Sequence, residues 1–243
     1  MPPRCNGRMT AEVSMLKVIS LGGSIVAPQD VDVPFVKQLQ LLVREYLEGK
    51  ADRRLIFVVG GGGPARAYQK AYRDISVTAE EIDEDWIGIA ATRLNAQLVK
   101  AVFHDLCADP VVIDPTAEIG FTGRVLVAAG WKPGFSTDYD AVLLAERFGA
   151  DSVINLSNIE KVFTADPKKD ASARPIDRIS WADFRRLVGD HWNPGANHPF
   201  DPIATKHAAG CGLRVVVAAG RNLPNLRAIL EDRPFLGTEI GPE

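Results

Sequence analysis

Four consecutive glycines, at residues 60–63, join an apolar run to a stretch that suits a helix. Residues 55–59 are typical of a buried strand, and Pro64 favours the first turn of a helix. A turn without side chains exposes backbone N–H groups beside the positive end of a helix dipole, which suits a phosphate or another anion. A flexible loop is the alternative, although strand and helix signals abut the run directly. The pattern predicts a strand–turn–helix unit with an anion site.

Length and composition bound the class of protein. The chain has 243 residues, 46% of them hydrophobic and 24% charged, which is ordinary for a globular enzyme of one α/β domain or two joined lobes. The net charge of -3 offers no excess of positive charge for nucleic acid or an anionic membrane surface. No apolar run reaches the roughly 18 residues of a membrane span. We therefore expect small-molecule partners, and no nucleic-acid or membrane partner.

The cysteines and the N-terminus indicate a compartment. Cys5, Cys107 and Cys211 are widely spaced and odd in number, which favours free thiols over a disulfide framework or a zinc site. Residues 1–14 lack the apolar core of a signal peptide, and we expect a disordered extension ahead of a natural start at Met15. The chain is expected to be cytoplasmic and to hold no metal site of its own.

Strand-like and helix-like segments alternate along the rest of the chain. Strands are expected at residues 16–21, 55–59, 152–156 and 214–218, with short apolar runs at 111–113 and 125–129. Helices are expected from Asp32 and Pro34 to Gly49, and at residues 64–70, 85–108, 141–148, 181–188 and 201–211. The long helix has an apolar stripe of Ile89, Leu94, Leu98, Val99 and Val102. A hairpin is expected between residues 156 and 170. The alternation predicts an α/β fold, a three-layer α/β/α sandwich around a mainly parallel central sheet.

Three small-residue loops follow predicted strands, at residues 22–24, 60–63 and 130–138. A parallel sheet brings such loops to one edge, where ligands gather, so the three loops indicate more than one phosphate group. The chain lacks the P-loop pattern, and the third glycine of a dinucleotide-binding fingerprint is replaced by Ala65. A Rossmann oxidoreductase is therefore a poor fit.

Charged and hydroxyl side chains beside these loops are candidate ligands. Arg66 lies in the first turn after the glycines and can reach a phosphate bidentately, and Lys206 lies in the second turn of a helix that begins at Asp201. For both, a solvated surface side chain is the alternative. Residues 136–138 offer two hydroxyls and a carboxylate, which can also cap a helix. His191 and His198 flank a loop that is either a lid or plain surface, and no histidine is given a catalytic role.

Taken in order, these segments resemble the amino acid kinase superfamily, and more closely the archaeal-type uridylate (UMP) kinases, over residues 16–242. The residues that carry the resemblance are 21–24, 58–62, 65–66, 87–89, 92–96, 133–134, 136–138, 144–146, 164–170, 201–202, Ala204 and Lys206. The chain differs from the family pattern at Ser20, where many members have a lysine, at Lys161, where a turn glycine is usual, and at residues 129–132. Gly63 stands where relatives often carry a side chain, which indicates a looser turn there.

The resemblance implies a role for each matching position. Gly22, Gly23 and Ser24 would line the ATP phosphates, and the adenosine side would be formed by Ser157, Asn158, Phe163 and Asp166. The phosphate of the acceptor nucleotide would lie on Gly61 and Gly62, its ribose near Asp85, and its uracil side along Gly130, Gly134, Ser136 and Thr137. The group implied to act on the transferred phosphoryl consists of Lys206, Arg66 and Asp138.

The resemblance implies transfer of the ATP γ-phosphoryl group to UMP with Mg²⁺, in pyrimidine nucleotide biosynthesis. It also implies an acceptor lobe at about residues 15–150, an ATP lobe at about 151–243, and a homohexamer built from dimers. Two alternatives stay open. The acceptor can be another small phosphate or carboxylate. Alternatively, the chain can be a nucleotide-binding or storage protein without catalysis, an alternative suggested by Ser20 and Lys161.

Overall fold

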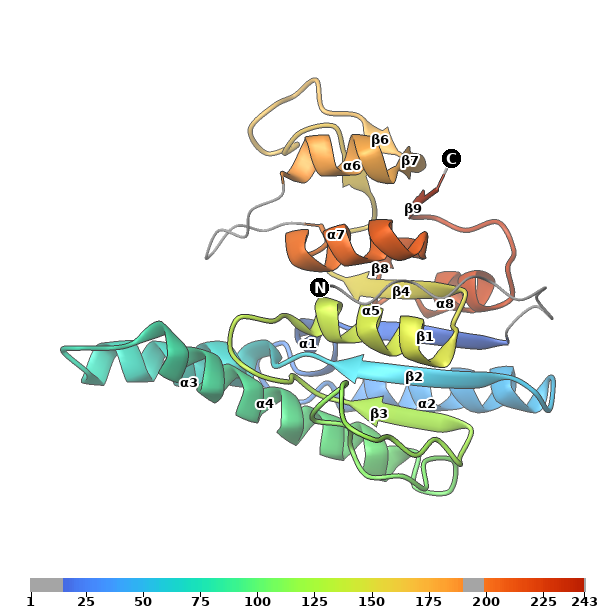
Figure 1. The fold of residues 1–243 in the computed structure, drawn as a ribbon, viewed down its shortest axis with the longest axis horizontal. Coiled ribbons are helices and arrows are strands. Elements are labelled where there is room, and N and C mark those ends of the chain that lie inside the picture. The colour runs from blue at the N-terminus through green and yellow to red at the C-terminus, as the bar shows by residue number, and fades with distance from the viewer. Residues whose placement is uncertain (1–14, 190–198, 243) are drawn as a thin grey trace.

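A seven-stranded, mainly parallel sheet forms the centre of the protein, in a computed structural model that describes residues 15–189 and 199–242 (Figure 1). The strand order is β3-β2-β1-β4-β8-β9-β7. The bounds are β1 (Leu16–Leu21), β2 (Arg54–Val59), β3 (Val125–Ala128), β4 (Ser152–Ser157), β7 (Arg178–Ser180), β8 (Arg214–Ala219) and β9 (Thr238–Gly241). The first five strands in this order are parallel, and β9 runs antiparallel to β8. The predicted extension at 1–14 and most of the predicted lid-or-surface loop lie outside the described residues.

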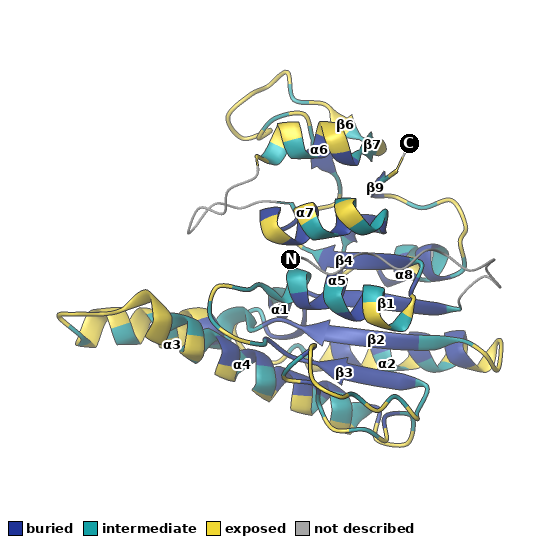
Figure 2. Ribbon diagram, in the orientation of Figure 1, coloured by how far each residue is buried: buried dark blue, intermediate teal, exposed yellow. Residues whose placement is uncertain are grey.

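Helices cover both faces of the sheet, so the predicted three-layer α/β/α sandwich is confirmed. One face carries α1 (Gly23–Val26), α2 (Val33–Glu48), α4 (Glu81–Val102) and α8 (Leu223–Leu230), and the other carries α5 (Thr137–Phe148), α6 (Trp181–Val188) and α7 (Pro202–Cys211). Strand side chains alternate between two cores: Ile19 and Leu21 join one, and Val18 joins the other. Buried residues accordingly follow the strands in Figure 2.

Local capping explains where several helices begin. The Asp32 side chain accepts a hydrogen bond from the Phe35 N–H at the start of α2, with Pro34 in the first turn. Asp201 accepts from the Ala204 N–H in the same way at the start of α7. A hairpin follows β4 as predicted, with β5 (Val162–Phe163) paired antiparallel with β6 (Pro175–Ile176), but its second strand lies beyond the predicted limit of residue 170.

The long helix departs from its prediction in bounds and in buried face. α4 begins at Glu81 and ends at Val102 rather than spanning 85–108. The earlier start is favoured because acidic residues of the first turn lie at the positive end of the helix dipole. Leu94 was expected in the buried stripe, but it is 68% exposed, whereas its neighbour Asn95 is buried. The apolar run at 111–113 contributes only an isolated bridge from Val112 to Ala128.

The glycine run is packed against another backbone segment. α3 (Gly62–Ile75) begins two residues before Pro64, and the loop after β1 lies directly against this start. A Cβ atom built on Gly23 would lie 2.1 Å from the Gly62 nitrogen, and one on Gly60 would lie 2.5 Å from the Gly23 nitrogen. A Cβ on Gly63 would lie 2.4 Å from the Pro28 carbonyl oxygen, so the prediction of a looser turn at Gly63 is wrong.

α3 and the first part of α4 project from the body of the molecule as an arm (Figure 1). The only buried residue of α3 is Ala65, and Figure 2 shows the arm as largely exposed. None of the helices in the described part of the chain has the length and apolar character of a membrane span.

Substituting Gly23 by alanine should destabilise the protein by about 1–3 kcal/mol, because the new methyl group would overlap backbone atoms that have no side-chain freedom to move. The midpoint of urea unfolding measures this effect. Gly210→Ala is the matched control, since a Cβ built there meets no atom within 4 Å. Equal midpoints for the two variants would contradict the packing argument.

Candidate active site

The small-residue loops meet at the carboxyl edge of the sheet. In register, Leu21 of β1 pairs with Val59 of β2 and with Leu156 of β4, so the loops that follow these strands emerge side by side. The chain adds β2 and β3 on one side of β1, then crosses to add β4 and β8 on the other side. The gap between the β1 and β4 loops is therefore a topological switch point, where open α/β sheets bind ligands.

Hydrogen bonds join the β1 and β4 loops. The Gly22 N–H donates to the Leu156 carbonyl at 2.9 Å, and the Asn158 Nδ2 donates to the Ser24 Oγ at 3.0 Å. The Ser157 Oγ accepts from the Ile159 N–H at 3.3 Å. These contacts bring together the residues predicted at the ATP phosphates and two of those predicted at the adenosine.

The other two predicted adenosine residues lie on the hairpin beyond β4. Phe163 is half-buried on β5, and Asp166 accepts from the Lys168 N–H in the turn that follows. In the described part of the chain, no hydrogen bond or ion pair links either side chain to the glycine loops.

The loop after β2 is held by a buried amide. The Asn95 Nδ2 of α4 donates to the carbonyls of Gly60 and Gly61, at 2.8 and 3.0 Å. The Gly63 N–H donates to the Ala27 carbonyl, whereas the N–H groups of Gly61 and Gly62 find no acceptor among the described residues. Two N–H donors thus remain at the start of α3, an arrangement that suits an anion.

Two hydrogen bonds attach the loop after β3 to α4. The Gly134 N–H donates to Asp85 Oδ2 at 3.0 Å, and the Gly130 N–H donates to the Thr92 Oγ1 at 2.8 Å. Ser136 then caps α5 by accepting from the Tyr139 N–H at 3.2 Å, and Thr137 is the first helical residue. The residues predicted on the acceptor side therefore occupy one connected region.

Asp138 connects three separate elements of the fold. Its Oδ1 accepts from the Ser20 Oγ of β1 at 2.8 Å, and its Oδ2 accepts from the Asp201 N–H at the start of α7 at 3.4 Å. Burial, with the nearby Asp201 charge, raises the pKa of Asp138 to about 6 against the opposing Ser20 hydrogen bond. The sequence shows Ser20 as a departure from the family pattern but does not reveal its partner, which lies 118 positions away.

Asp140 lies two residues after Asp138 on α5 and is a functional candidate that the sequence did not reveal. It is 1% exposed, and its Oδ2 accepts from the Trp131 N–H at 3.2 Å. Its Oδ1 has no partner in the described part of the chain. Burial raises the pKa of Asp140 to about 7. The sequence signal for a buried carboxylate was an acidic residue directly before the small apolar run 141–145.

The predicted cations lie at different places on this edge. The Arg66 Nη2 donates to the Pro28 carbonyl at 3.0 Å, which places the guanidinium beside the glycine loops. Lys206 is exposed on α7 and forms no ion pair with a described residue. Lys161, one of the departures from the family pattern, is ion-paired with Asp177.

Comparison with known proteins agrees with this arrangement. The sequence profile of the amino acid kinase family matches residues 15–219. The chain belongs to this family. The uridylate kinase of Methanospirillum hungatei JF-1 is 38% identical over 227 residues, which cover 92% of this chain and 93% of that protein. The uridylate kinase of Methanothrix thermoacetophila is 37% identical over 232 residues, covering 93% and 99%.

Solved structures show that the likeness extends to the three-dimensional fold. The crystal structure of uridylate kinase from Archaeoglobus fulgidus has 33% sequence identity and a TM-score of 0.79, and covers 93% of this chain and 99% of that chain. The UMP kinase of Bacillus anthracis, at 19% identity and a TM-score of 0.74, shares the fold. The predicted family is thus confirmed.

The substitution Asp140→Asn should change the pH dependence of stability of this protein. Because the folded pKa of about 7 lies above the ordinary value of 3.8, the unfolded chain loses its proton first as pH rises, and the free energy of unfolding falls between about pH 4 and 7. The difference in free energy of unfolding between the variant and the parent protein should therefore shift in favour of the variant by on the order of 2 kcal/mol from pH 5 to pH 8.

Urea unfolding at the two pH values measures the gain, and the asparagine oxygen can still accept from the Trp131 N–H. Asp30→Asn, at an exposed position, is the control. An Asp140→Asn variant that differs from the parent equally at pH 5 and pH 8 would show that Asp140 does not titrate in this range.

Proposed function

We propose that this protein is a nucleoside monophosphate kinase that transfers the γ-phosphoryl group of ATP to UMP, giving UDP for pyrimidine nucleotide biosynthesis. The observation that carries the proposal is the direct contact of two glycine loops at the switch point, Gly23 against Gly60 and Gly62. Two adjacent anion-binding loops suit two nucleotides whose phosphates must meet. Relatives named uridylate kinase, up to 38% identical over most of the chain, support UMP as the acceptor.

The donor nucleotide is assigned to the loops after β1 and β4. Gly22, Gly23 and Ser24 would contact its phosphates. This assignment is supported by the hydrogen bonds that join the loop to the end of β4 and to Asn158. The adenosine would lie towards Ser157, Asn158 and the hairpin that carries Phe163 and Asp166. The division into an acceptor lobe and an ATP lobe stays a prediction.

The acceptor is assigned to the loops after β2 and β3. The N–H groups of Gly61 and Gly62, without acceptors among the described residues, would bind its phosphate. Asp85 would contact the ribose while it holds the Gly134 N–H, and the loop with Gly130, Gly134, Ser136 and Thr137 would lie along the base.

The reaction needs charge compensation rather than a general base. The second pKa of a phosphate monoester is about 6, so the acceptor oxygen of UMP is already mostly ionised at neutral pH. Arg66, Lys206 and the loop N–H groups would instead offset the negative charge spread over the transferred group. Asp138 would position this machinery, because it ties β1 to the start of α7, the helix that carries Lys206.

Magnesium fits this scheme as the counter-ion of ATP. In the part of the chain that the structure describes, no set of three acidic side chains converges at the carboxyl edge of the sheet. Mg²⁺ commonly keeps several waters and binds through substrate phosphates, and there it would offset phosphate charge.

We place the reaction in the cytoplasm, since neither Cys107 nor Cys211 forms a disulfide.

The substitution Lys206→Ala should lower kcat with UMP by about 100-fold, because one charged group that stabilises the transferring phosphoryl is lost. ADP release in a coupled assay measures the effect, and Lys37→Ala on the exposed face of α2 is the control. An unchanged kcat would remove Lys206 from the site.

The same assay separates the alternatives when the acceptor is varied at fixed ATP. The proposal expects UMP to be preferred over CMP and over small phosphate or carboxylate acceptors. Preference for one of those acceptors would keep the fold and change the substrate. ATP binding without phosphoryl transfer to any acceptor would identify a non-catalytic nucleotide-binding protein.

We also propose that the arm of α3 and α4 joins copies of this chain into a homo-oligomer, for which a dimer-based hexamer is the family expectation. Its support is a set of large apolar side chains exposed on the arm, among them Tyr68 at 71% and Ile75 at 82%. Apolar groups gathered on one projecting element are typical of interfaces.

The double substitution of Tyr68 and Ile75 by glutamate should reduce the oligomer to smaller species, because burying two carboxylates in an interface is unfavourable. Light scattering coupled to size-exclusion chromatography measures the mass. Val31→Glu, at an exposed apolar position outside the arm, is the control. A monomeric parent protein, or an unchanged mass for the double variant, would contradict the assignment.

A further inference from the structure

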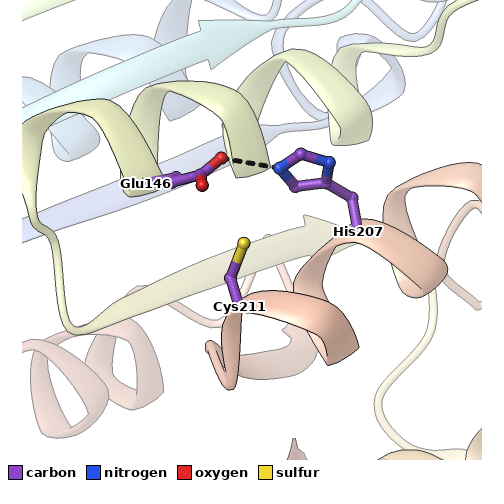
Figure 3. Close-up of side chains that lie close together, drawn as sticks. All are labelled: Glu146, His207 and Cys211. Atoms are coloured by element: carbon purple, nitrogen blue, oxygen red, sulfur yellow. Dashed lines mark hydrogen bonds and ion pairs between the residues drawn. The ribbon is translucent and has the colours of Figure 1, made fainter. Parts of the chain in front are cut away.

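A group of three potential metal ligands lies between α5 and α7, apart from the glycine loops (Figure 3). Glu146 comes from the last turn of α5, and His207 and Cys211 come from α7. The two α7 residues are four positions apart, so they share one face of the helix. One ligand atom from each residue lies within 4.8 Å of the other two, and the His207 Nε2 is 2.7 Å from the Glu146 Oε2.

We propose that Glu146, His207 and Cys211 bind a divalent transition-metal ion, with Zn²⁺ as the best match. Thiolate, imidazole and carboxylate are the ligands that zinc takes in proteins. This ligand set also balances the charge, because one thiolate and one carboxylate neutralise the ion. The proposal concerns a site outside the proposed kinase centre and stands independently of the proposed function.

The spacing of the ligand atoms is close to what a tetrahedral ion requires. Zinc–ligand bonds of about 2.0–2.3 Å place neighbouring ligand atoms roughly 3.3–3.7 Å apart. The contact between His207 and Glu146 is shorter than this, and the widest separation in the group is at most 4.8 Å. Small side-chain rotations would therefore admit the ion, which would replace the hydrogen bond between the imidazole and the carboxylate.

The surroundings of the group favour binding over a solvated surface cluster. The side chains of His207 and Glu146 are 22% and 29% exposed, so an ion can enter but is partly shielded from water. The Tyr139 ring packs edge-on against the imidazole with centroids 5.6 Å apart, which restricts its orientation. Three protein ligands leave a fourth position for water or another small ligand.

A bound ion would link the two helices that position the phosphoryl-transfer residues. α5 carries Asp138 near its start, and α7 carries Lys206 next to His207. The competing explanation is an ordinary hydrogen-bonded pair between Glu146 and His207 that needs no metal. The two explanations differ in the part given to the Cys211 thiol.

Cobalt titration of the metal-free full-length protein, without nucleotide, tests the proposal. Co²⁺ is the probe because it occupies zinc sites and absorbs visibly, and a coordinated thiolate adds a charge-transfer band in the near ultraviolet. We expect one Co²⁺ per chain with this band, displacement by Zn²⁺, and a higher Tm with Zn²⁺. Cys211→Ser should abolish the band, and His207→Gln and Glu146→Gln should each weaken binding at least 10-fold.

His104→Gln, at an exposed histidine, and Cys107→Ser, at a thiol elsewhere in the fold, are the matched controls and should leave binding unchanged. Absence of the thiolate band in the parent protein would overturn the proposal. So would a band that survives in Cys211→Ser. Because the spectrum requires no turnover, failure of the kinase proposal would not affect this result.

Discussion

The close approach of the loops after β1 and β2 is the contact on which the rest of the site depends. Gly23 lies so near Gly60 and Gly62 that no side chain fits between the two backbones. The starts of α1 and α3 are thereby placed side by side, with their N–H groups at one edge of the sheet. Glycine loses more conformational freedom on folding than other residues. That cost is offset here because only glycine allows the two backbones to approach so closely.

Polar side chains, most of them buried, then hold the elements around these loops in place. The Asn95 amide occupies the carbonyls of Gly60 and Gly61, Thr92 and Asp85 hold the loop after β3, and Ser20 holds Asp138. The bonds of Asn95, Thr92 and Asp85 tie loops to α4, and the bond of Ser20 ties α5 to β1. Such ordering before a ligand binds reduces the entropy that binding must overcome.

Features encoded by neighbouring residues could be predicted from the sequence. The strands before the glycine loops, the caps at Asp32 and Asp201 and the family motifs depend on short stretches of chain. The bond from Ser20 to Asp138 joins residues 118 positions apart, and α4 buries Asn95 rather than Leu94 because the loop carbonyls need donors. The group of Glu146, His207 and Cys211 escaped prediction because a search within one helix cannot supply the ligand from the other. The four-residue α1 is too short for a periodic signal.

The exposure of α3 gives its two ends unequal stability. The first turn is anchored by Ala65 and the glycine contacts, whereas the distal turns add no buried side chain. In a single chain, amide hydrogens near Ile75 can therefore exchange with solvent through local fraying that leaves the base of the helix closed, so protection should rise from Ile75 towards Ala65. The tip of the helix, where the proposed interface between copies lies, is therefore less stable than its base beside the glycine loops.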